Sequence, residues 1–598
     1  MKEYVMGNGA IALGALAAGV NLVAGYPGTP SSEIIETVAK YPHEGIHLEW
    51  SVNEKAALEV AAAAAYSGAR ALVTMKQMGL NVASDPLMSV AYIGVKGGLV
   101  IVSADDPGPI SSQTEQDTRR FAGFSRIPVF DPASPEEAYA MIQDAFACSE
   151  KYHTPVLFRP TTRVCHAYAA IDVPDRWEPA SFEGFRKDAS RWVIFPRLSY
   201  ANHGKMEARN AEIARDFSAY RFNTVEGAAG PRAILTSGVS YAYVKECLRK
   251  HPEARIIRVA TAFPFPEDFL LRALEGVEEL LCIEELSPWL EEQALQVAGR
   301  HHLALTVRGK LDGTVPHHGE NSVALSGRLL ADFLGLEPGP SPRDCSGAPP
   351  LPVRPPVLCA GCPHRASFYA VKQAMKGQKA FFCGDIGCYT LGNAMPLDMV
   401  DTCLCMGAGI TMAQGLRHTN PDAVCFAFVG DSTFFASGMT GVVNAVYNEA
   451  DMVLCVLDNS TTAMTGHQPH PGTGRNMMGH IVDRVDIARE LEGIGVRRVV
   501  TVDPLRLEEA VQAVRSCAAE KGVTAIIFKS PCVALTKPTG KCVIDGQKCI
   551  ACKKCIREIG CPALITDQGQ VRIDPNLCTG CGLCGQICPV GAIGGAEQ

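Results

Sequence analysis

The stretch Val424-Cys-Phe-Ala-Phe-Val-Gly430-Asp431-Ser432, followed by Met452-Val-Leu-Cys-Val-Leu-Asp458-Asn459, decides the fold class of this chain. Each part is a short apolar run that ends in polar residues, which is typical of a strand buried in a parallel sheet. Because neighbouring parallel strands end at the same edge of a sheet, we expect Asp431 and Asn459 to lie close together. Their oxygens suit a hard divalent cation, and a helix that starts after Gly430 would offer free amides to a diphosphate.

Similar apolar runs recur along most of the 598 residues. Strands are expected at 71–74, 99–103, 155–159, 233–236, 255–259, 280–283 and 524–528, and helices at 53–67 and 135–149. This alternation predicts an α/β protein with parallel sheets. Eight prolines mark a linker at 338–356, the chain turns polar near 170–230, and its composition shifts to cysteine after 537. The predicted segments are therefore 1–180, 181–337, the linker 338–356, 357–537 and 538–598.

Nine of the 24 cysteines lie between Cys542 and Cys588. The second half of this tail reads C-x2-C-x2-C-x3-C-P, the pattern of bacterial ferredoxins with two 4Fe–4S clusters. In that pattern three closely spaced cysteines bind one cluster and the cysteine before proline crosses to the other. The expected ligand sets are Cys549, Cys552, Cys555 and Cys588 for one cluster, and Cys578, Cys581, Cys584 and Cys561 for the other.

The first half of the tail departs from this pattern, since five residues separate Cys555 from Cys561 instead of three. Structural zinc is the alternative, because C-x2-C pairs also bind zinc. Two C-x2-C-x2-C sets, each followed by C-P, are not the usual two-pair zinc spacing. Cys542 is left over and is expected not to be a ligand.

The stretch around Asp431 resembles the thiamine diphosphate motif, in which G-D-S is followed after about 26 residues by an asparagine. The resemblance implies that Asp431, Asn459 and a backbone carbonyl near Thr461 bind Mg²⁺, with Gly430 and Ser432 beside the cofactor. Thiamine diphosphate also needs a carboxyl group that protonates its aminopyrimidine ring.

Glu54, which follows the strand-like residues 46–50, is the candidate for this catalytic carboxyl group. The alternative is an ordinary helix-start glutamate, which the helix dipole favours.

Further motifs lie outside these regions: Tyr26-Pro-Gly-Thr29-Pro-Ser31-Ser32-Glu33, Asn53-Glu54-Lys55, Lys76-Gln-Met-Gly79-Leu-Asn81, Cys359-Ala-Gly-Cys362-Pro-His364-Arg365, Asp385-Ile-Gly-Cys388 and Gly466-His467-Gln-Pro-His470-Pro. Together with the tail they resemble the 2-oxoacid:ferredoxin oxidoreductases, most closely the indolepyruvate branch. The resemblance covers essentially the whole chain. It implies a pyrimidine-binding domain at 1–180, with Thr29 at the cofactor, and a transketolase-C-terminal-like domain at 181–337. A diphosphate- and Mg²⁺-binding domain at 357–537 and a two-cluster ferredoxin domain at 538–598 follow.

The implied activity is oxidative decarboxylation of aryl 2-oxoacids, such as indolepyruvate, to arylacetyl-CoA and carbon dioxide. Electrons would pass through 4Fe–4S clusters to ferredoxin, coenzyme A would take the acyl group, and a smaller β subunit would complete the enzyme. One alternative is a pyruvate or other 2-oxoacid oxidoreductase. Another is an electron-transfer subunit with a degenerate thiamine fold, although Gly430, Asp431, Asn459 and Glu54 are all present.

Four further residues in these motifs are candidates for the site, and the three histidines among them each have a second interpretation. His364, a candidate catalytic residue, and Arg365 would lie near the reacting centre or substrate carboxylate, or His364 would simply begin a helix. His467 and His470 would line the opening of the cofactor site or lie exposed in a loop rich in glycine and proline.

A third cluster is a further alternative, because related pyruvate-type enzymes place cysteines in comparable positions. The simpler interpretation is that the four cysteines concerned are buried free thiols. Members of the indolepyruvate branch are usually described with the two tail clusters only. The cysteines are Cys359, Cys362, Cys388 and Cys532.

The net charge of −8 disfavours a nucleic-acid surface. The sequence has no unbroken run of about 20 apolar residues, so it predicts no membrane span. A thiol-rich chain that binds clusters fits the reducing cytoplasm.

Overall fold

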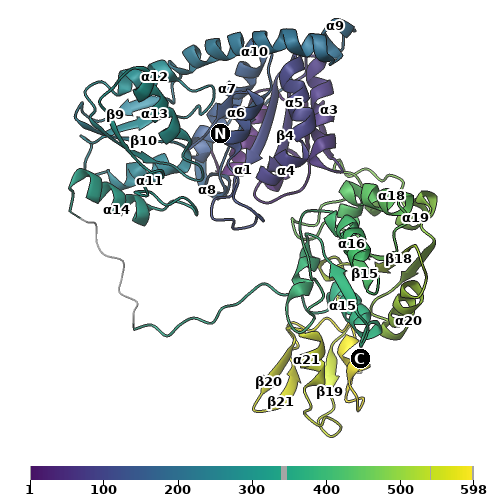
Figure 1. Cartoon of the computed structure of the whole chain (residues 1–598). Coiled ribbons are helices and arrows are strands. Elements are labelled where there is room, and N and C mark those ends of the chain that lie inside the picture. The colour runs from purple at the N-terminus through teal and green to yellow at the C-terminus, as the bar shows by residue number, and fades with distance from the viewer. Residues whose placement is uncertain (1, 338–346, 539, 596–598) are drawn as a thin grey trace. The chain divides into compact units, whose positions relative to one another are not determined.

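The computed structural model describes residues 2–337, 347–538 and 540–595. The chain forms two compact units, Met1–Ala348 and Pro349–Gln598, each of which is described by itself (Figure 1). The predicted linker at 338–356 lies partly outside the described residues. The finer boundaries at 180 and 537 stay predictions.

The first unit begins with a parallel sheet of six strands, which have the order β3-β2-β4-β5-β7-β6. Strands β4 and β5 are buried along almost their whole length, as their apolar runs predict. The bounds are β3 (His47–Trp50), β2 (Leu22–Gly25), β4 (Ala71–Lys76), β5 (Leu99–Ala104), β7 (Val156–Phe158) and β6 (Val129–Phe130).

Helices cover this sheet, and an antiparallel pair of strands, β1 (Lys2–Met6) and β8 (Tyr168–Asp172), lies beside it. Helices α1 and α7 pack very closely, since a Cβ on Gly14 would lie 2.5 Å from the carbonyl oxygen of Tyr139. The helices are α1 (Gly7–Ala17), α2 (Ser32–Val38), α3 (Glu54–Tyr66), α4 (Gln77–Val82), α5 (Ser84–Ile93), α6 (Thr118–Ser125), α7 (Pro135–Tyr152) and α8 (Thr162–His166).

A second sheet of five strands completes the unit, in the order β13-β12-β10-β11-β9, with only β9 antiparallel to its neighbour. The strands are β13 (Thr306–Arg308), β12 (Glu279–Ile283), β10 (Arg232–Thr236), β11 (Arg255–Arg258) and β9 (Thr224–Glu226). The helices are α11 (Gly238–Cys247), α12 (Glu267–Ala273), α13 (Trp289–Arg300) and α14 (Val323–Leu334).

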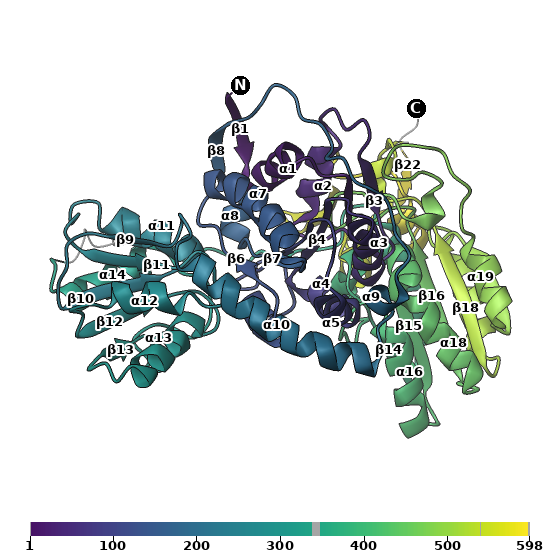
Figure 2. The same ribbon diagram turned by 90° about the horizontal axis from the view of Figure 1, so that it is seen from above.

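The segment between the two sheets is more regular than its polar sequence indicates. It contains α9 (Ala189–Trp192) and the 22-residue helix α10 (Pro196–Phe217). Helix α10 packs against both α5 and α12 and therefore ties the first sheet's helices to the second's (Figure 2). It buries one narrow stripe in its C-terminal half, formed by Met206, Asn210, Ile213 and Phe217.

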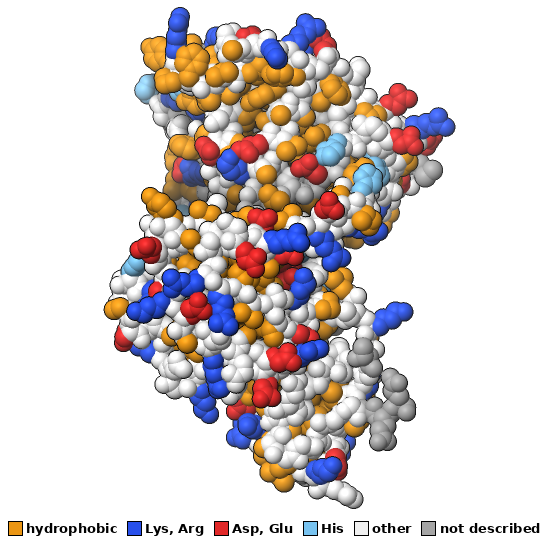
Figure 3. Space-filling view, turned by 90° about the vertical axis from the view of Figure 1, so that its right-hand side faces the viewer, with side chains coloured by type: hydrophobic (Ala, Val, Ile, Leu, Met, Phe, Trp, Pro, Cys, Tyr) orange, Lys and Arg blue, Asp and Glu red, His pale blue; other side chains and the backbone are white. Residues whose placement is uncertain are grey.

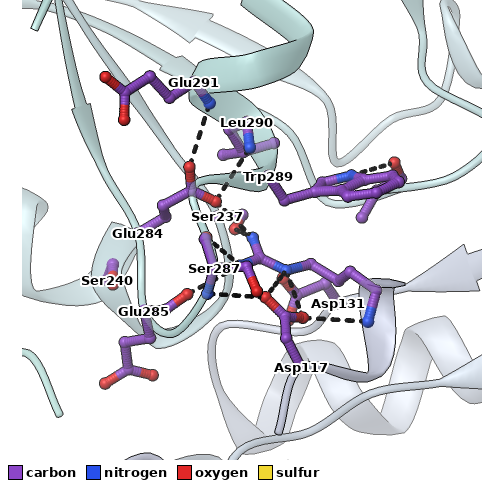
Figure 4. A network of polar contacts seen from close by, with 12 residues as sticks. Asp117, Asp131, Ser237, Ser240, Glu284, Glu285, Ser287, Trp289, Leu290 and Glu291 are labelled. Atoms are coloured by element: carbon purple, nitrogen blue, oxygen red, sulfur yellow. Dashed lines mark hydrogen bonds and ion pairs between the residues drawn. The ribbon is translucent and has the colours of Figure 1, made fainter. Parts of the chain in front are cut away.

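A buried network of charges also joins the two sheets of this unit. The Arg119 guanidinium lies 2.7 Å from both Asp117 and Glu284, and it donates to the backbone carbonyl of Glu285 at 2.8 Å. The backbone N–H of Ser287 donates to Asp117 at 3.0 Å, and Figure 4 shows the loop after β12 meeting Asp117 in this way. Two acidic partners offset the cost of burying Arg119.

Glu285, in the same loop, yields a test of stability against pH. Its buried carboxyl accepts the N–H of Asn321 at 2.9 Å, and burial raises its pKa from 4.5 to about 7. Because the folded pKa is the higher one, this carboxyl lowers the free energy of unfolding as pH rises from about 4.5 to about 7. Glu285→Gln should therefore stabilise the unit by up to about 3 kcal/mol at pH 8 and by almost nothing at pH 4.5.

Tryptophan fluorescence during denaturation is the measurement, since all four tryptophans, at 50, 177, 192 and 289, lie in this unit. The exposed Glu278→Gln serves as the control. A stability difference that does not change between pH 5 and pH 8 would contradict the expectation.

The second unit contains a parallel sheet of five strands in the order β14-β15-β16-β18-β17. The strands are β14 (Ala380–Cys383), β15 (Val424–Gly430), β16 (Met452–Asp458), β18 (Val523–Lys529) and β17 (Arg498–Val502). The helices are α15 (Pro363–Ala374), α16 (Ala408–Thr419), α17 (Asp431–Thr433), α18 (Met439–Tyr447), α19 (Ile487–Ile494) and α20 (Leu507–Ala518).

The cysteine tail packs onto this sheet domain. Apolar residues of α15, such as Phe368, share one core with Ile559, Leu583 and Ile593 of the tail. The tail pairs β19 (Cys542–Ile544) with β22 (Ile593–Gly595) and β20 (Leu564–Asp567) with β21 (Gln570–Ile573), and adds helices α21 (Lys554–Ile559) and α22 (Leu583–Ile587). Among the described residues, no helix combines the length and apolar character needed to cross a bilayer.

Candidate functional site

Asp431 and Asn459 meet where β15 and β16 end. The register pairs Gly430 with Leu457, so the residues that follow lie at one edge of the sheet. The backbone N–H of Asn459 donates to Oδ2 of Asp431 at 3.1 Å, and that of Ser432 donates to Oδ1 at 2.8 Å. The structure thus brings the predicted residues of the G-D-S stretch together with Asn459.

The loop after Asn459 folds back onto this edge. Ser460 has a φ of +61°, a left-handed conformation that is uncommon outside glycine and often found at functional sites. The Thr461 N–H donates to Oδ1 of Asn459 at 3.2 Å. His470 lies buried with Nε2 at 3.1 Å from Oδ2 of Asp431, whereas His467 is exposed.

His364, in the first turn of α15, reaches the same edge. Its Nε2 lies 3.1 Å from Nδ2 of Asn459, and its ring stands edge-on to Tyr389. Burial lowers the pKa of His364 to about 4, so the ring is neutral near pH 7. A neutral ring accepts from the Asn459 amide through Nε2 and carries its proton on Nδ1.

The next residue, Arg365, contacts the tail instead. Its guanidinium donates to the carbonyl oxygen of Gly560 at 3.0 Å and also to those of Ile559 and Leu358. Its Nε is buried and has no hydrogen-bond partner among the described residues. Arg365 therefore joins α15 to the tail, and the expectation that it lies by the reacting centre stays a prediction.

Two cavities in the tail are lined by cysteines. One lies against the start of α15 and is lined by Gly361, Cys362 and Arg365 together with tail residues, among which are Cys561, Cys578, Cys581 and Cys584. The other is lined by tail residues alone, among which are Cys549, Cys552, Cys555 and Cys588. The cysteines are thus grouped in the two sets that the crossover pattern predicts. No group of three or more Cys, His, Asp or Glu side chains in the described residues is arranged to hold a single metal ion.

The four cysteines considered for a third cluster are only partly gathered. Cys359 lies close enough to Cys388 and Cys532 to affect their pKa values, which burial raises. Cys362 lies three residues after Cys359 and donates its backbone N–H to the carbonyl oxygen of Cys359 at 3.2 Å, but it also lines the first tail cavity.

Glu54 lies in the first unit, at the start of α3. Asn53 caps this helix by accepting the N–H of Ala56 at 2.8 Å. The Glu54 side chain is buried, and burial raises its pKa although Lys76 lies nearby. A Cβ on Gly79 would lie 2.7 Å from the Glu54 carboxyl, so glycine is needed there.

Thr29 lies partly exposed in the turn between β2 and α2, and its carbonyl oxygen accepts from Ser111 at 3.3 Å.

Three residues that lie beside the predicted site residues were not predicted to belong to the site. Lys76 and Gly79 accompany Glu54, and Tyr389 donates to the buried Asp385 at 3.1 Å, close to His364. The available signal was the motif Lys76–Asn81 for the first two, and for Tyr389 its place directly after the motif Asp385–Cys388.

Comparison with known proteins decides the family. The indolepyruvate oxidoreductase subunit IorA of Methanothermobacter thermautotrophicus is 40% identical over 99% of this chain and 97% of its own length. The chain belongs to this family. The subunits of the same name from Archaeoglobus fulgidus and Pyrococcus horikoshii are 38% and 37% identical, over 100% and 99% of this chain and 98% and 96% of theirs.

Family models match three parts of the chain in the predicted order. Residues 13–211 match the pyruvate flavodoxin/ferredoxin oxidoreductase thiamine diphosphate-binding domain, and 385–528 match the C-terminal TPP-binding domain of thiamine pyrophosphate enzymes. Residues 571–594 match a 4Fe–4S binding domain. These matches and the parallel sheets confirm the predicted family and the predicted α/β fold class.

Proposed function

We propose that this chain is the thiamine diphosphate- and cluster-binding subunit of an enzyme that oxidatively decarboxylates aryl 2-oxoacids such as indolepyruvate. The products would be arylacetyl-CoA and carbon dioxide, with ferredoxin as electron acceptor. The observation that carries the proposal is the placement of α15. Its first turn contacts Asn459 through His364 and lines the cysteine-rich first tail cavity through Arg365. One helix thus adjoins both kinds of predicted cofactor site.

The residues at the sheet edge fit a diphosphate on Mg²⁺. Asp431 and Asn459 supply oxygens side by side, and Thr461 adds a carbonyl from the turned loop. The backbone groups around Gly430 and Ser432 would receive the diphosphate. Thiamine diphosphate, when bound, supplies the electron sink for decarboxylation.

Glu54 fits the carboxyl that the aminopyrimidine ring needs. Its raised pKa means that the buried side chain keeps a proton more readily than an exposed glutamate does. We place Thr29 beside the cofactor as well. His364 would hold Asn459 in place as a neutral acceptor, and we assign it to the catalytic site on that contact.

Each tail cavity fits a 4Fe–4S cluster, because at least four thiols line it together with apolar side chains. The buried, unpartnered Nε–H of Arg365 in the first cavity supports this, since a cluster sulfur would accept its hydrogen bond. Bound clusters supply one-electron carriers. We assign one cluster to Cys561, Cys578, Cys581 and Cys584 and the other to Cys549, Cys552, Cys555 and Cys588.

The proposed partners are a smaller β subunit, ferredoxin, coenzyme A and the aryl 2-oxoacid, in the cytoplasm. The relatives' names describe them as subunits. An apolar surface supports a protein partner, because large exposed apolar patches often mark interfaces. It lies around α9, where Phe185, Val193 and Phe195 are about half exposed. Figure 3 shows hydrophobic side chains gathered on the upper part of the molecule in that view.

Anaerobic turnover with the partner subunit tests the substrate class. We expect kcat/KM for indolepyruvate and phenylpyruvate to exceed that for pyruvate at least about tenfold, because an aryl pocket gains apolar contact. Reduction of ferredoxin or viologen is the readout. Rates with pyruvate that equal the aryl rates would instead favour a general 2-oxoacid oxidoreductase. Iron and acid-labile sulfide should come to about eight per chain, against about twelve if a third cluster formed.

A further inference from the structure

One thiol in the tail belongs to neither proposed ligand set. Cys542 begins β19, where it pairs with Gly595 of β22, and only 6% of the residue is exposed. It lines the first cavity, the one that also contains Cys561, Cys578, Cys581 and Cys584. Six cysteines therefore line a site that needs four ligands: Cys362 at the start of α15 and five in the tail, of which Cys542 is the one outside the ligand sets.

Cys542 contacts two of the four proposed ligands. Its backbone N–H donates to Sγ of Cys578 at 3.4 Å, and its thiol lies within hydrogen-bonding reach of the thiols of Cys578 and Cys584, where Cys584 is the donor as long as both are thiols. Cluster ligands are thiolates and have no proton to give. With a cluster bound, Cys542 would therefore be the donor in these contacts.

The internal duplication of the tail supplies a natural comparison. Cys542 lies seven residues before Cys549, and Val571 lies seven residues before Cys578. The two residues occupy matching places in β19 and β21, and Val571 lines the second cavity as Cys542 lines the first. At this position the first cavity has a thiol donor and the second has an isopropyl group.

Hydrogen bonds to cluster sulfurs stabilise the reduced cluster, because reduction adds negative charge to those sulfurs. We propose that Cys542 raises the reduction potential of the cluster in the first cavity by donating to the sulfurs of Cys578 and Cys584, and so makes two similar clusters unequal. The proposal rests on the proposed cluster assignment. The cluster that is easier to reduce then lies against α15, on the side of the thiamine diphosphate domain.

The test is an EPR-monitored redox titration of the full chain, purified anaerobically with its partner subunit. Cys542→Val gives the first cavity the side chain that the second already has. We expect the reduction potential of one cluster to fall by at least about 59 mV, which for one electron is a tenfold lower ratio of reduced to oxidised cluster at a fixed potential. Cys542→Ser, which keeps a donor, should stay near wild type. Val571→Cys, the matched control, should raise the other step.

Iron content separates the two levels of the proposal. Wild-type protein without about eight irons would contradict the cluster assignment itself. If Cys542→Val keeps its iron and both potentials stay unchanged, the cluster assignment stands and the role of Cys542 is wrong. A loss of about four irons in Cys542→Val and Cys542→Ser would make Cys542 a ligand, which also contradicts the tuning role.

Discussion

Replacing Glu54 with glutamine is expected to lower kcat about 10²–10⁴-fold, the usual contribution of a positioned acid or base. The variant keeps the size of the side chain and its place beside Gly79, where there is no room for a Cβ. It removes the carboxyl proton that, in the proposed role of Glu54, would be exchanged with the aminopyrimidine ring. Steady-state turnover of the complex with its partner subunit, at saturating thiamine diphosphate and Mg²⁺, is the measurement.

Glu59→Gln is the matched control, because Glu59 lies on the same helix but is exposed and pairs with Lys55. It should keep activity within about twofold, as surface changes usually do. Thiamine diphosphate bound per chain should be counted in each protein, so that lost binding is separated from lost chemistry. Activity of Glu54→Gln close to wild type would mean that Glu54 is only a helix-start residue, the alternative that its position allows.

The sheet strands could be predicted because burial on both faces leaves an almost uninterrupted apolar run. Strands β15 and β16 begin at Val424 and Met452, where their two apolar runs begin, and end within one residue of those runs. Short edge strands such as β9 and β13 lack that signal, since they are partly exposed and have polar residues. Helix α10 was missed for a related reason. Only a narrow stripe of it is buried, so its sequence is largely polar.

The contacts of the candidate site also divide into those that the sequence could predict and those that it could not. Contacts set by spacing along the chain were predictable, such as the approach of Asp431 to Asn459 and the grouping of the tail cysteines. The contact between His364 and Asn459 joins residues 95 positions apart, and no local pattern specifies it. The role of Arg365 was likewise hidden, because its acceptors are backbone carbonyls, which the sequence does not distinguish. Cys542 was set aside because spacing identifies ligands and not their neighbours.

Asp431→Asn is expected to weaken the binding of thiamine diphosphate at least about 100-fold, since even indirect partners of a metal site can cost 10–100-fold in affinity. The substitution removes the negative charge that Mg²⁺ needs. In one orientation the asparagine amide places its NH₂ group where Oδ2 now accepts the N–H of Asn459. In the other orientation the NH₂ group faces the N–H of Ser432, which loses its acceptor. Two donors facing each other would open the sheet edge at which we propose that the cofactor binds.

Equilibrium dialysis of thiamine diphosphate over a range of Mg²⁺ concentrations measures this effect. Asp422→Asn is the control, since Asp422 is exposed in the same unit and pairs only with Lys379 among the described residues. Iron content should stay at its wild-type value in both variants, because the tail cavities contain neither aspartate. If Asp431→Asn bound the cofactor with unchanged affinity and unchanged dependence on Mg²⁺, the end of β15 would not be the metal site. The diphosphate would then have to bind elsewhere on the chain.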